Sequence, residues 1–286
     1  MKIVETVAEV REQVKAWRKE GLTVGLVPTM GYLHEGHQSL IAKACAQNDR
    51  VVVSVFVNPT QFGPNEDLES YPRDLEHDAA LCESTGAALI FHPTPEEMYP
   101  KGFCSFVDMD VLTKELCGLS RPVHFRGVCT VVSKLLHIVQ PGRAYFGEKD
   151  AQQLAVIRRM VLDLNMNVEI VGCPIVRESD GLAKSSRNTY LSPAERKAAL
   201  VLSKSIFAGK QLAEAGETDA AKLVQAMTEI IEAEPLAKID YVKVVDLMTM
   251  QQIPKLDRPF LAAIAVYIGK TRLIDNFMMQ AGGTAE

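Results

Sequence analysis

The 286-residue sequence lacks a long apolar run, a signal-peptide pattern and any excess of positive charge. No uncharged apolar stretch approaches the roughly 20 residues that cross a bilayer, so we expect no membrane segment. Glu5, Glu9 and Glu12 interrupt the apolar core that a signal peptide would need. The net charge of −5 argues against a general attraction to nucleic acid or to an anionic membrane.

The sequence also lacks the common signatures of metal, disulfide and P-loop sites. Its six cysteines stand singly, without a C-x-x-C pair, and indicate buried free thiols in a reducing compartment, by default the cytoplasm. His34 and His37 are three residues apart, whereas the zinc motif H-E-x-x-H needs a spacing of four. Gly269-Lys270-Thr271 imitates the end of a Walker loop, but Ile264 stands where its first glycine belongs.

The first part of the chain alternates short apolar runs with helical patterns. We predict helices over residues 36–46, 74–85, 127–139 and 151–164, and strands over residues 23–27, 50–57, 87–91 and 144–146. The β-branched run RVVVSVFV at 50–57 is typical of a strand buried on both faces of a parallel sheet. The pattern predicts a doubly wound, Rossmann-like α/β domain, whose ligands bind at the carboxyl ends of the strands.

The pattern changes after residue 176. A polar segment, RESDGLAKSSRNTYLS, precedes predicted helices over 193–215 and 219–233 and predicted strands over 239–245, 260–267 and 271–274. Ser192 and Glu195 form a capping box at the start of the first helix. We therefore expect an α/β domain over 1–176 and a smaller α+β domain over 177–286, which ends in a disordered AGGTAE tail.

Three short motifs could bind phosphate. PTMGYLHEGH (28–37) lies between a strand and a helix, where backbone N–H groups and two imidazoles can meet an anion. A turn with two exposed histidines explains its spacing equally well. In GEKD (147–150), Lys149 could reach a phosphate, while Asp150 could simply cap the next helix. KSSRN (184–188) could clamp a polyphosphate or be a solvated basic linker.

In this order the three motifs resemble the nucleotidyltransferase superfamily, and longer blocks narrow the resemblance to the pantothenate synthetase family. These blocks are PTMGYLHEGH, VSVFVNPTQF, YPRD, RPVHFRGV, YFGEKDAQQL, DGLAKSSRN and RLIDN. The resemblance implies a cytoplasmic homodimer that uses ATP and Mg²⁺ to convert pantoate to pantoyl adenylate and joins it to β-alanine, releasing AMP and pyrophosphate.

The resemblance also implies roles for individual residues. His37, the expected proton donor, and His34, Lys149 and Arg187 are the expected catalytic residues. Gln61 and Gln153 are expected to bind pantoate, Gln61 also β-alanine, while Asn58 and Tyr71 shape the pocket and Asp78 lies near magnesium. Without the family, Gln153 would be interpreted as an ordinary surface residue and Asp78 as an exposed helical aspartate. The expected ATP contacts are Met30, Gly31, Tyr32, Leu33, His34, Glu35, Gly36, His37, Gly147, Glu148, Lys149, Asp150, Val176, Lys184, Ser185, Ser186 and Arg187.

Some alternatives stay open. Many relatives carry an apolar residue where this chain has Lys184, so we assign Lys184 no essential role. Arg121, His124 and Arg126 could bind an acidic substrate or pair with local carboxylates. Rival functions are an adenylyltransferase that makes a dinucleotide-like product, a tRNA-charging enzyme and a non-catalytic nucleotide-binding module. The NPTQF block with Gln61 and Gln153 argues against the adenylyltransferase. The lack of a basic anticodon-binding domain argues against the tRNA-charging enzyme. The retained phosphate-facing residues argue against the non-catalytic module.

Overall fold

The computed structural model describes residues 1–64 and 66–280, so the predicted tail at 281–286 lies outside the described residues. The chain forms two compact units. The first comprises residues 1–109, 121–148 and 156–174; the second comprises residues 110–120, 149–155 and the chain from 175 onward. One boundary therefore falls beside the expected division after residue 176, but two earlier segments group with the second unit.

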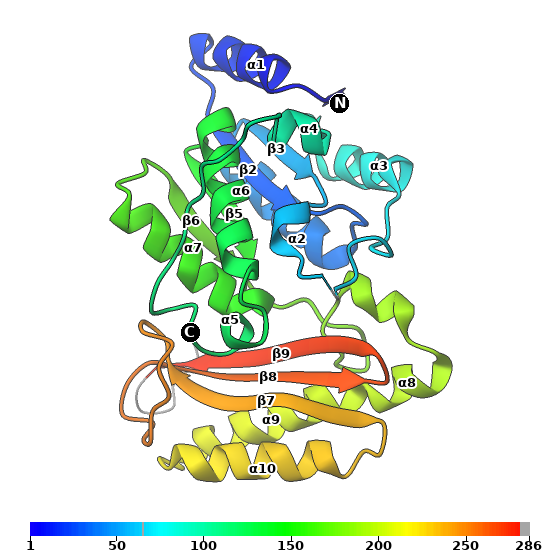
Figure 1. The fold of residues 1–286 in the computed structure, drawn as a ribbon, viewed down its shortest axis with the longest axis vertical. Helices are drawn as coiled ribbons and strands as arrows, with labels where there is room; N and C mark the ends of the chain where they lie inside the picture. Colours follow the sequence, from blue (N-terminus) through cyan, green and yellow to red (C-terminus); the bar gives the residue numbers. More distant parts are fainter. Residues whose placement is uncertain (65, 281–286) are drawn as a thin grey trace. The chain divides into compact units, whose positions relative to one another are not determined.

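The first unit is built on a parallel sheet, as the sequence predicts, and this sheet has six strands (Figure 1). The strand order is β1-β4-β3-β2-β5-β6. The strands are β1 (Lys2–Val4), β2 (Val24–Thr29), β3 (Arg50–Val55), β4 (Leu89–Phe91), β5 (Arg143–Gly147) and β6 (Glu169–Cys173). The order reverses beside β2, which pairs with β3 on one side and β5 on the other, and such a switch point is where doubly wound sheets bind ligands.

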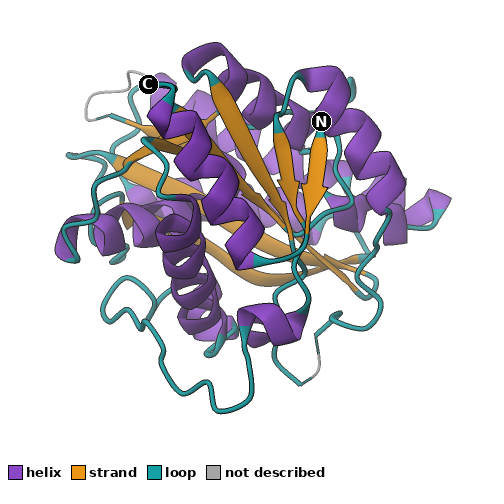
Figure 2. Cartoon of the chain, turned by 90° about the horizontal axis from the view of Figure 1, so that it is seen from above, coloured by secondary structure: helices purple, strands orange, loops and turns teal. Residues whose placement is uncertain are grey.

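Helices cover both faces of this sheet (Figure 2). They are α1 (Val7–Lys19), α2 (Glu35–Gln47), α3 (Leu75–Thr85), α4 (Pro95–Met98), α6 (His124–Val139) and α7 (Ala151–Asp163), whose first turn belongs to the second unit, with short 3-10 turns η1 (Pro59–Gln61) and η2 (Glu148–Asp150). Leu40 and Ile41 of α2 pack with Val27 and Val53 of the sheet in one buried aliphatic cluster. This packing fixes the beginning of α2 beside the carboxyl end of β2.

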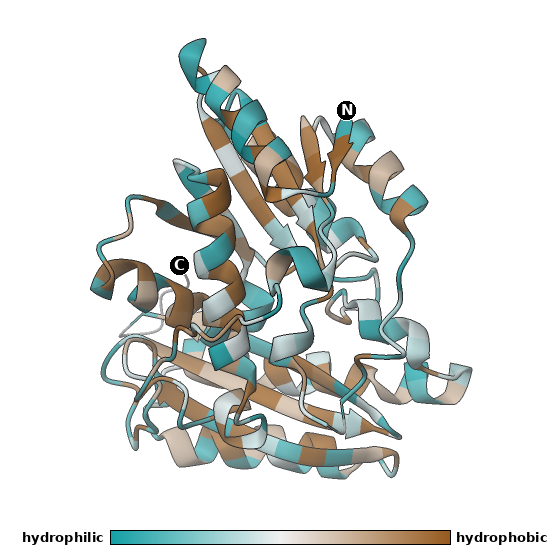
Figure 3. Ribbon diagram, turned by 45° about the horizontal axis from the view of Figure 1, so that its top comes forward, coloured by the Kyte–Doolittle hydropathy of each residue, from teal (hydrophilic) through white to brown (hydrophobic). Residues whose placement is uncertain are grey.

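The second unit contains a three-stranded antiparallel sheet in the order β7-β8-β9. Its strands are β7 (Ala237–Asp246), β8 (Phe260–Ile268) and β9 (Thr271–Met279), and its other elements are α5 (Cys117–Ser120), η3 (Ser186–Tyr190), α8 (Pro193–Ala198), α9 (Leu200–Glu214) and α10 (Ala220–Glu232). Helices α9 and α10 cover the sheet (Figure 1) through a core that includes Leu202, Leu223 and Ile264. The central strand β8 is hydrophobic along most of its length (Figure 3).

Several elements differ from the expected ones. The predicted helix over 193–215 is interrupted at Ala199, and β9 continues to Met279 beyond its predicted end at residue 274. Strands β1 and β6 were not predicted. The six cysteines are free thiols, but the expectation that all are buried is wrong, because Cys104 is exposed. Among the described residues, no helix combines the length and apolar character needed to cross a membrane.

Candidate active site

The loop after β2 is held in position by a buried carboxylate. Asp78, on α3, is only 1% exposed, and it accepts the Tyr32 N–H at 2.9 Å and the Leu33 N–H at 2.6 Å. Gly31 has a φ of +86°, and a Cβ there would lie 2.9 Å from the Val55 side chain and 3.0 Å from the Asp78 carboxylate. The loop therefore needs glycine at this position, and Asp78 determines its conformation.

His34 and His37 form the cap of α2 with their own rings. The His34 Nδ1 accepts the Gly36 N–H at 3.1 Å, and the His37 Nδ1 accepts the His34 N–H at 3.2 Å. The ring centroids are 4.1 Å apart. Because each Nδ1 is an acceptor, the ring proton of each neutral imidazole is on Nε2. Both Nε2–H groups thus belong to a helix N-terminus at the switch point of the sheet, where an anion is stabilised.

Gln61 is buried among polar partners in the same unit. Asn58 donates to Gln61 Oε1 at 3.0 Å, and Gln61 Nε2 contacts Met30 Sδ at 3.3 Å. Helix α6 lies close to these residues, since Asn58 also donates to the carbonyl of Gly127 in that helix at 3.2 Å. The structure therefore brings the predicted residues Met30, Asn58 and Gln61 together. Tyr71, also predicted, is buried and makes an edge-on contact with Phe62.

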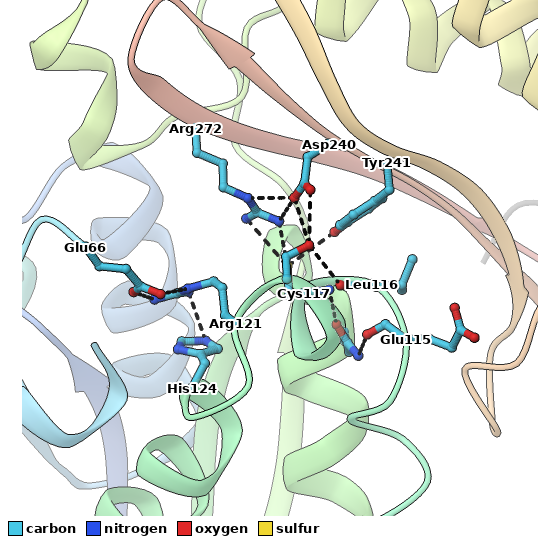
Figure 4. Close-up of polar contacts among 11 residues, drawn as sticks. Glu66, Glu115, Leu116, Cys117, Arg121, His124, Asp240, Tyr241 and Arg272 are labelled. Atoms are coloured by element: carbon cyan, nitrogen blue, oxygen red, sulfur yellow. Dashed lines mark hydrogen bonds and ion pairs between the residues drawn. The ribbon is translucent and has the colours of Figure 1, made fainter. Parts of the chain in front are cut away.

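The three basic residues at the start of α6 have different partners. Arg121 forms a two-point ion pair with Glu66 (Figure 4). His124 bonds to Gln61 O at 3.1 Å. Arg126 is exposed and lies over the Phe106 ring, 4.2 Å from its centroid. Arg121 therefore pairs with a local carboxylate beside Gln61, and Arg126 does not share these partners.

In the second unit, Lys149 and Asp150 precede the body of α7. Lys149 Nζ lies 3.5 Å from Asp150 Oδ2, and the Lys149 carbonyl accepts Asn276 Nδ2 at 2.8 Å. Asn276 belongs to the RLIDN block, so β9 fixes the backbone of the expected phosphate-binding lysine. Gln153, predicted to bind pantoate, is half-buried. Its neighbour Gln152 is buried; its side chain donates to the carbonyls of Leu112 and Glu115 and accepts the Cys117 N–H.

The predicted ATP-binding loop of the second unit is closed by main-chain hydrogen bonds. Lys184 N–H donates to Val176 O at 2.9 Å. Ser185 caps η3 by accepting the Arg187 N–H at 3.3 Å, and Ser186 is buried. These bonds bring Val176 and residues 184–187 together, as expected of one binding loop. The sequence did not predict the ion pair that supports this loop. Arg177 makes a two-point ion pair with buried Asp275 of β9 at 2.7 and 2.9 Å.

A second missed cluster fixes α5 within the second unit. Arg272 donates to Asp240 at 2.7 and 3.0 Å and lies 3.6–3.7 Å from Cys117 Sγ (Figure 4). The Tyr241 hydroxyl is 3.2 Å from the same sulfur atom. Lys243 additionally pairs with Glu115 at 2.5 Å. These contacts explain why residues 110–120 group with the second unit although the chain on either side belongs to the first.

The residues present do not fit a magnesium site at Asp78. Both carboxylate oxygens already accept backbone N–H groups, and burial raises the pKa of Asp78 above its ordinary value despite those bonds. No group of three or more histidine, cysteine, aspartate or glutamate residues within 1–64 and 66–280 has an arrangement suited to a metal ion. The structure therefore favours a positioning role for Asp78.

The first unit has the fold of a doubly wound α/β protein with a helix N-terminus at its switch point, an architecture that nucleotide-binding enzymes use. Residues 2–278 match the sequence model of the pantoate-beta-alanine ligase family. This chain belongs to that family.

Relatives match along nearly the whole chain. A pantothenate synthetase of Ruminiclostridium cellulolyticum is 68% identical, over 97% of this chain and 98% of that protein. The crystal structure of pantothenate synthetase from Thermus thermophilus is 48% identical, with a TM-score of 0.91 over 97% of this chain and 99% of that chain. A pantoate-beta-alanine ligase from Francisella tularensis, complexed with beta-gamma ATP and beta-alanine, is 35% identical with a TM-score of 0.80, over 99% and 100%.

Proposed function

We propose that this protein uses ATP to adenylate pantoate and then transfers the pantoyl group to β-alanine, releasing pyrophosphate and AMP. Its membership of the pantoate-beta-alanine ligase family supports the reaction. So does the related ligase of Francisella tularensis, whose structure contains beta-gamma ATP and beta-alanine. The single structural observation that carries the proposal is the pair of imidazole caps at the beginning of α2.

The first step forms a bond between a pantoate carboxylate oxygen and the α-phosphorus of ATP and breaks the bond from that phosphorus to the bridging pyrophosphate oxygen. Negative charge grows on the phosphoryl oxygens as this happens. The Nε2–H groups of His34 and His37 are proposed to donate hydrogen bonds to these oxygens. Transfer of the His37 proton, which the family resemblance implies, does not fit a neutral ring whose Nδ1 accepts the His34 N–H. Since Asp78 and the helix caps fix the loop before substrate arrives, the donors need little reorganisation.

Lys149 and Arg187 of the second unit are proposed to bind phosphate oxygens as fixed positive charges. Asn276 holds the Lys149 backbone, and Ser185 holds the Arg187 backbone, so both cations are carried on ordered main chain. The other predicted ATP contacts at 30–37, 147–150, 176 and 184–186 stay predictions. No step here relies on a protein-bound metal, and Mg²⁺ is proposed to arrive with ATP as part of the substrate.

Gln61 and Gln153 are proposed to bind pantoate, with Gln61 also reaching β-alanine. The second step forms a C–N bond between the β-alanine amine and the acyl carbon, and breaks the acyl C–O bond to AMP. The proton that the amine loses as the bond forms passes to solvent. No protein nucleophile is needed, because adenylation already supplies a good leaving group. We further propose, from family resemblance, that the protein works in the cytoplasm as a homodimer.

The test of this proposal is a product assay. Purified protein supplied with ATP, pantoate, β-alanine and Mg²⁺ should form pantothenate, AMP and pyrophosphate in equal amounts. Omission of pantoate should abolish all three products. Formation of ADP and phosphate in their place would indicate an acyl-phosphate mechanism and contradict the proposal. Light scattering of the same sample during size-exclusion chromatography would test the homodimer.

A further inference from the structure

The carboxylate of Glu66 forms an ion pair with the guanidinium of Arg121, beside Gln61. Arg121 Nε donates to Glu66 Oε1 at 2.9 Å, and Arg121 Nη2 pairs with Glu66 Oε2 (Figure 4). The two parallel contacts have the geometry in which arginine recognises any carboxylate. Both side chains are largely withdrawn from water, with 16% and 23% of their surfaces exposed. The pair therefore resembles a small carboxylate-binding site that is filled from within.

The guanidinium has a fixed position relative to Gln61. Arg121 Nη2 lies 3.5 Å from Gln61 O, and His124 Nδ1 donates to the same carbonyl at 3.1 Å. Since Nδ1 is the donor, His124 Nε2 is an acceptor, and it receives Arg121 Nη1 at 3.3 Å. His124 thus connects the guanidinium with the backbone of the residue proposed to contact both substrates.

A cation near Gln61 would have a function in the second step of the proposed reaction. The carboxylate of pantoate is consumed when the adenylate forms, so the free carboxylate at the second step is that of β-alanine. That carboxylate is separated from the attacking amine by two methylene groups and takes no part in bond making. A buried positive charge at this short distance from the amine would orient the nucleophile and select it over other amines.

We propose that Arg121 binds the carboxylate of β-alanine, and that Glu66 occupies Arg121 until β-alanine displaces it. This inference rests on the proposed ligation of pantoate to β-alanine. Exchange of one carboxylate for another keeps the guanidinium paired throughout, whereas an amine without a carboxylate cannot replace Glu66, which then stays on Arg121. Arg121 therefore favours β-alanine over uncharged amines of the same length, and His124 acts as a positioning residue for Arg121.

The ionisation of Glu66 agrees with this role. Burial raises the pKa of Glu66, but the hydrogen bonds and the positive charge of Arg121 lower it overall below its ordinary value. Glu66 is consequently ionised at neutral pH and can compete with a substrate carboxylate. Its backbone N–H donates to Gly63 O at 3.1 Å, which places the carboxylate toward the guanidinium.

The experiment compares Arg121→Ala, Arg121→Lys and Glu66→Gln with the wild type. Two reactions are measured: pyrophosphate release from ATP and pantoate alone, and full ligation at varied concentrations of β-alanine or of its carboxamide, β-alaninamide. Arg121→Ala should raise the KM for β-alanine about tenfold or more, because a buried charge-assisted contact is lost. Its kcat/KM ratio of β-alanine to β-alaninamide should fall by a similar factor, while pyrophosphate release changes little.

The other variants test the exchange itself. Arg121→Lys, which keeps the charge but loses the two-point geometry, should recover part of the preference for β-alanine. Glu66→Gln removes the competing charge and should lower the KM for β-alanine by about threefold or more, on the same electrostatic grounds. Arg126→Ala, on the same helix but over the Phe106 ring, is the matched control and should change neither reaction.

Defined results would overturn the inference. An unchanged preference for β-alanine in Arg121→Ala would do so, as would a raised KM for pantoate in the pyrophosphate assay without a change for β-alanine. If Arg121→Ala does not fold, an increased KM for β-alanine in Glu66→Gln would have the same meaning. Failure of the wild type to release pyrophosphate with pantoate would instead contradict the proposed function.

Discussion

His34 and His37 each contribute a helix cap through Nδ1 and a potential phosphoryl donor through Nε2, so replacing either ring removes two functions together. A substitution by asparagine separates them, because asparagine is a good cap but lacks a group at the Nε2 position. We expect His34→Ala and His34→Asn both to slow pyrophosphate release from ATP and pantoate by roughly 10²–10³-fold. Only His34→Ala should also lose about 1 kcal/mol of stability.

Pyrophosphate release and thermal unfolding of the same samples check this expectation. Near-normal turnover in folded His34→Asn would show that the ring acts as a cap alone. The sequence predicted both histidines at the helix start, since their spacing and the strand before them are local. It did not reveal their tautomers, which depend on which backbone N–H each ring accepts.

Glu66 should make the stability of the protein depend on pH in the acid range. Its pKa in the folded state lies below the ordinary value of 4.5, chiefly because interactions with Arg121 outweigh burial. Between the two values the unfolded chain binds more protons, so the free energy of unfolding falls as the pH is lowered. Glu66→Gln cannot titrate, and its difference in stability from the wild type should shrink as pH falls from about 6 to about 3.

Urea unfolding at a series of pH values measures this difference. Glu76→Gln, which removes an exposed carboxylate of α3, serves as the comparison and should not reproduce the pH dependence. A constant difference between the wild type and Glu66→Gln across the acid range would contradict the assignment. The ion pair itself could not be predicted, because its partners are 55 residues apart and no local pattern connects them.

At the scale of elements, α6 reaches Gln61 only because Gly127 has no side chain. A Cβ at Gly127 would lie 2.5 Å from Gln61 Cα and 2.5 Å from Thr60 O, which are backbone atoms that cannot rotate away. We expect Gly127→Ala to displace η1 from α6, to destabilise the fold by about 1–3 kcal/mol and to raise the KM for pantoate. Gly142→Ala, whose Cβ would meet only Val24 O at 4.0 Å, is the matched control.

Denaturant unfolding and steady-state kinetics of both glycine variants test this expectation. Equal behaviour of Gly127→Ala and Gly142→Ala would show that the contact between α6 and η1 does not shape the pocket. The sequence predicted α6 from its apolar pattern, but the approach of its first turn to η1 depends on tertiary packing and could not be predicted.

Strand β9 shows why the second unit was harder to predict from sequence than the first. Its predicted end at residue 274 precedes Asp275 and Asn276, which interrupt the apolar pattern. Both are nevertheless buried in the strand, because Asp275 pairs with Arg177 and Asn276 holds the Lys149 carbonyl. Polar residues with distant partners therefore look like a strand end when only the sequence is considered.

At the scale of the whole molecule, the change of pattern after residue 176 predicts a single division of the chain, whereas each compact unit is assembled from three segments. Residues 110–120 and 149–155 join the second unit through Gln152, Arg272 and Asn276. Each of these bonds links positions distant in sequence. The parallel sheet, by contrast, was predictable because its four central strands, β2 to β5, stand in locally apolar runs between helical patterns.

The distribution of charge between the two units leads to a prediction about the two half-reactions. Lys149→Ala and Arg187→Ala should slow pyrophosphate release from ATP and pantoate by about 10²-fold or more, because each removes charge proposed to stabilise the transferring phosphoryl group. With preformed pantoyl adenylate and β-alanine, both variants should lose much less activity, since pyrophosphate has already left. Lys222→Ala, which removes a surface lysine paired with Glu217 in the same unit, is the control.

Isotope transfer tests the chemistry that underlies these roles. The attacking carboxylate oxygen of pantoate becomes the bridge to phosphorus, and it leaves with AMP when the acyl C–O bond breaks. Pantoate labelled with ¹⁸O in its carboxylate should therefore pass label to AMP and none to pyrophosphate, as measured by mass spectrometry. Label retained entirely in pantothenate would show that the carboxylate never attacked the α-phosphorus. The proposed roles of His34, His37, Lys149 and Arg187 would then have to be abandoned together, because all four depend on charge developing at that phosphoryl group.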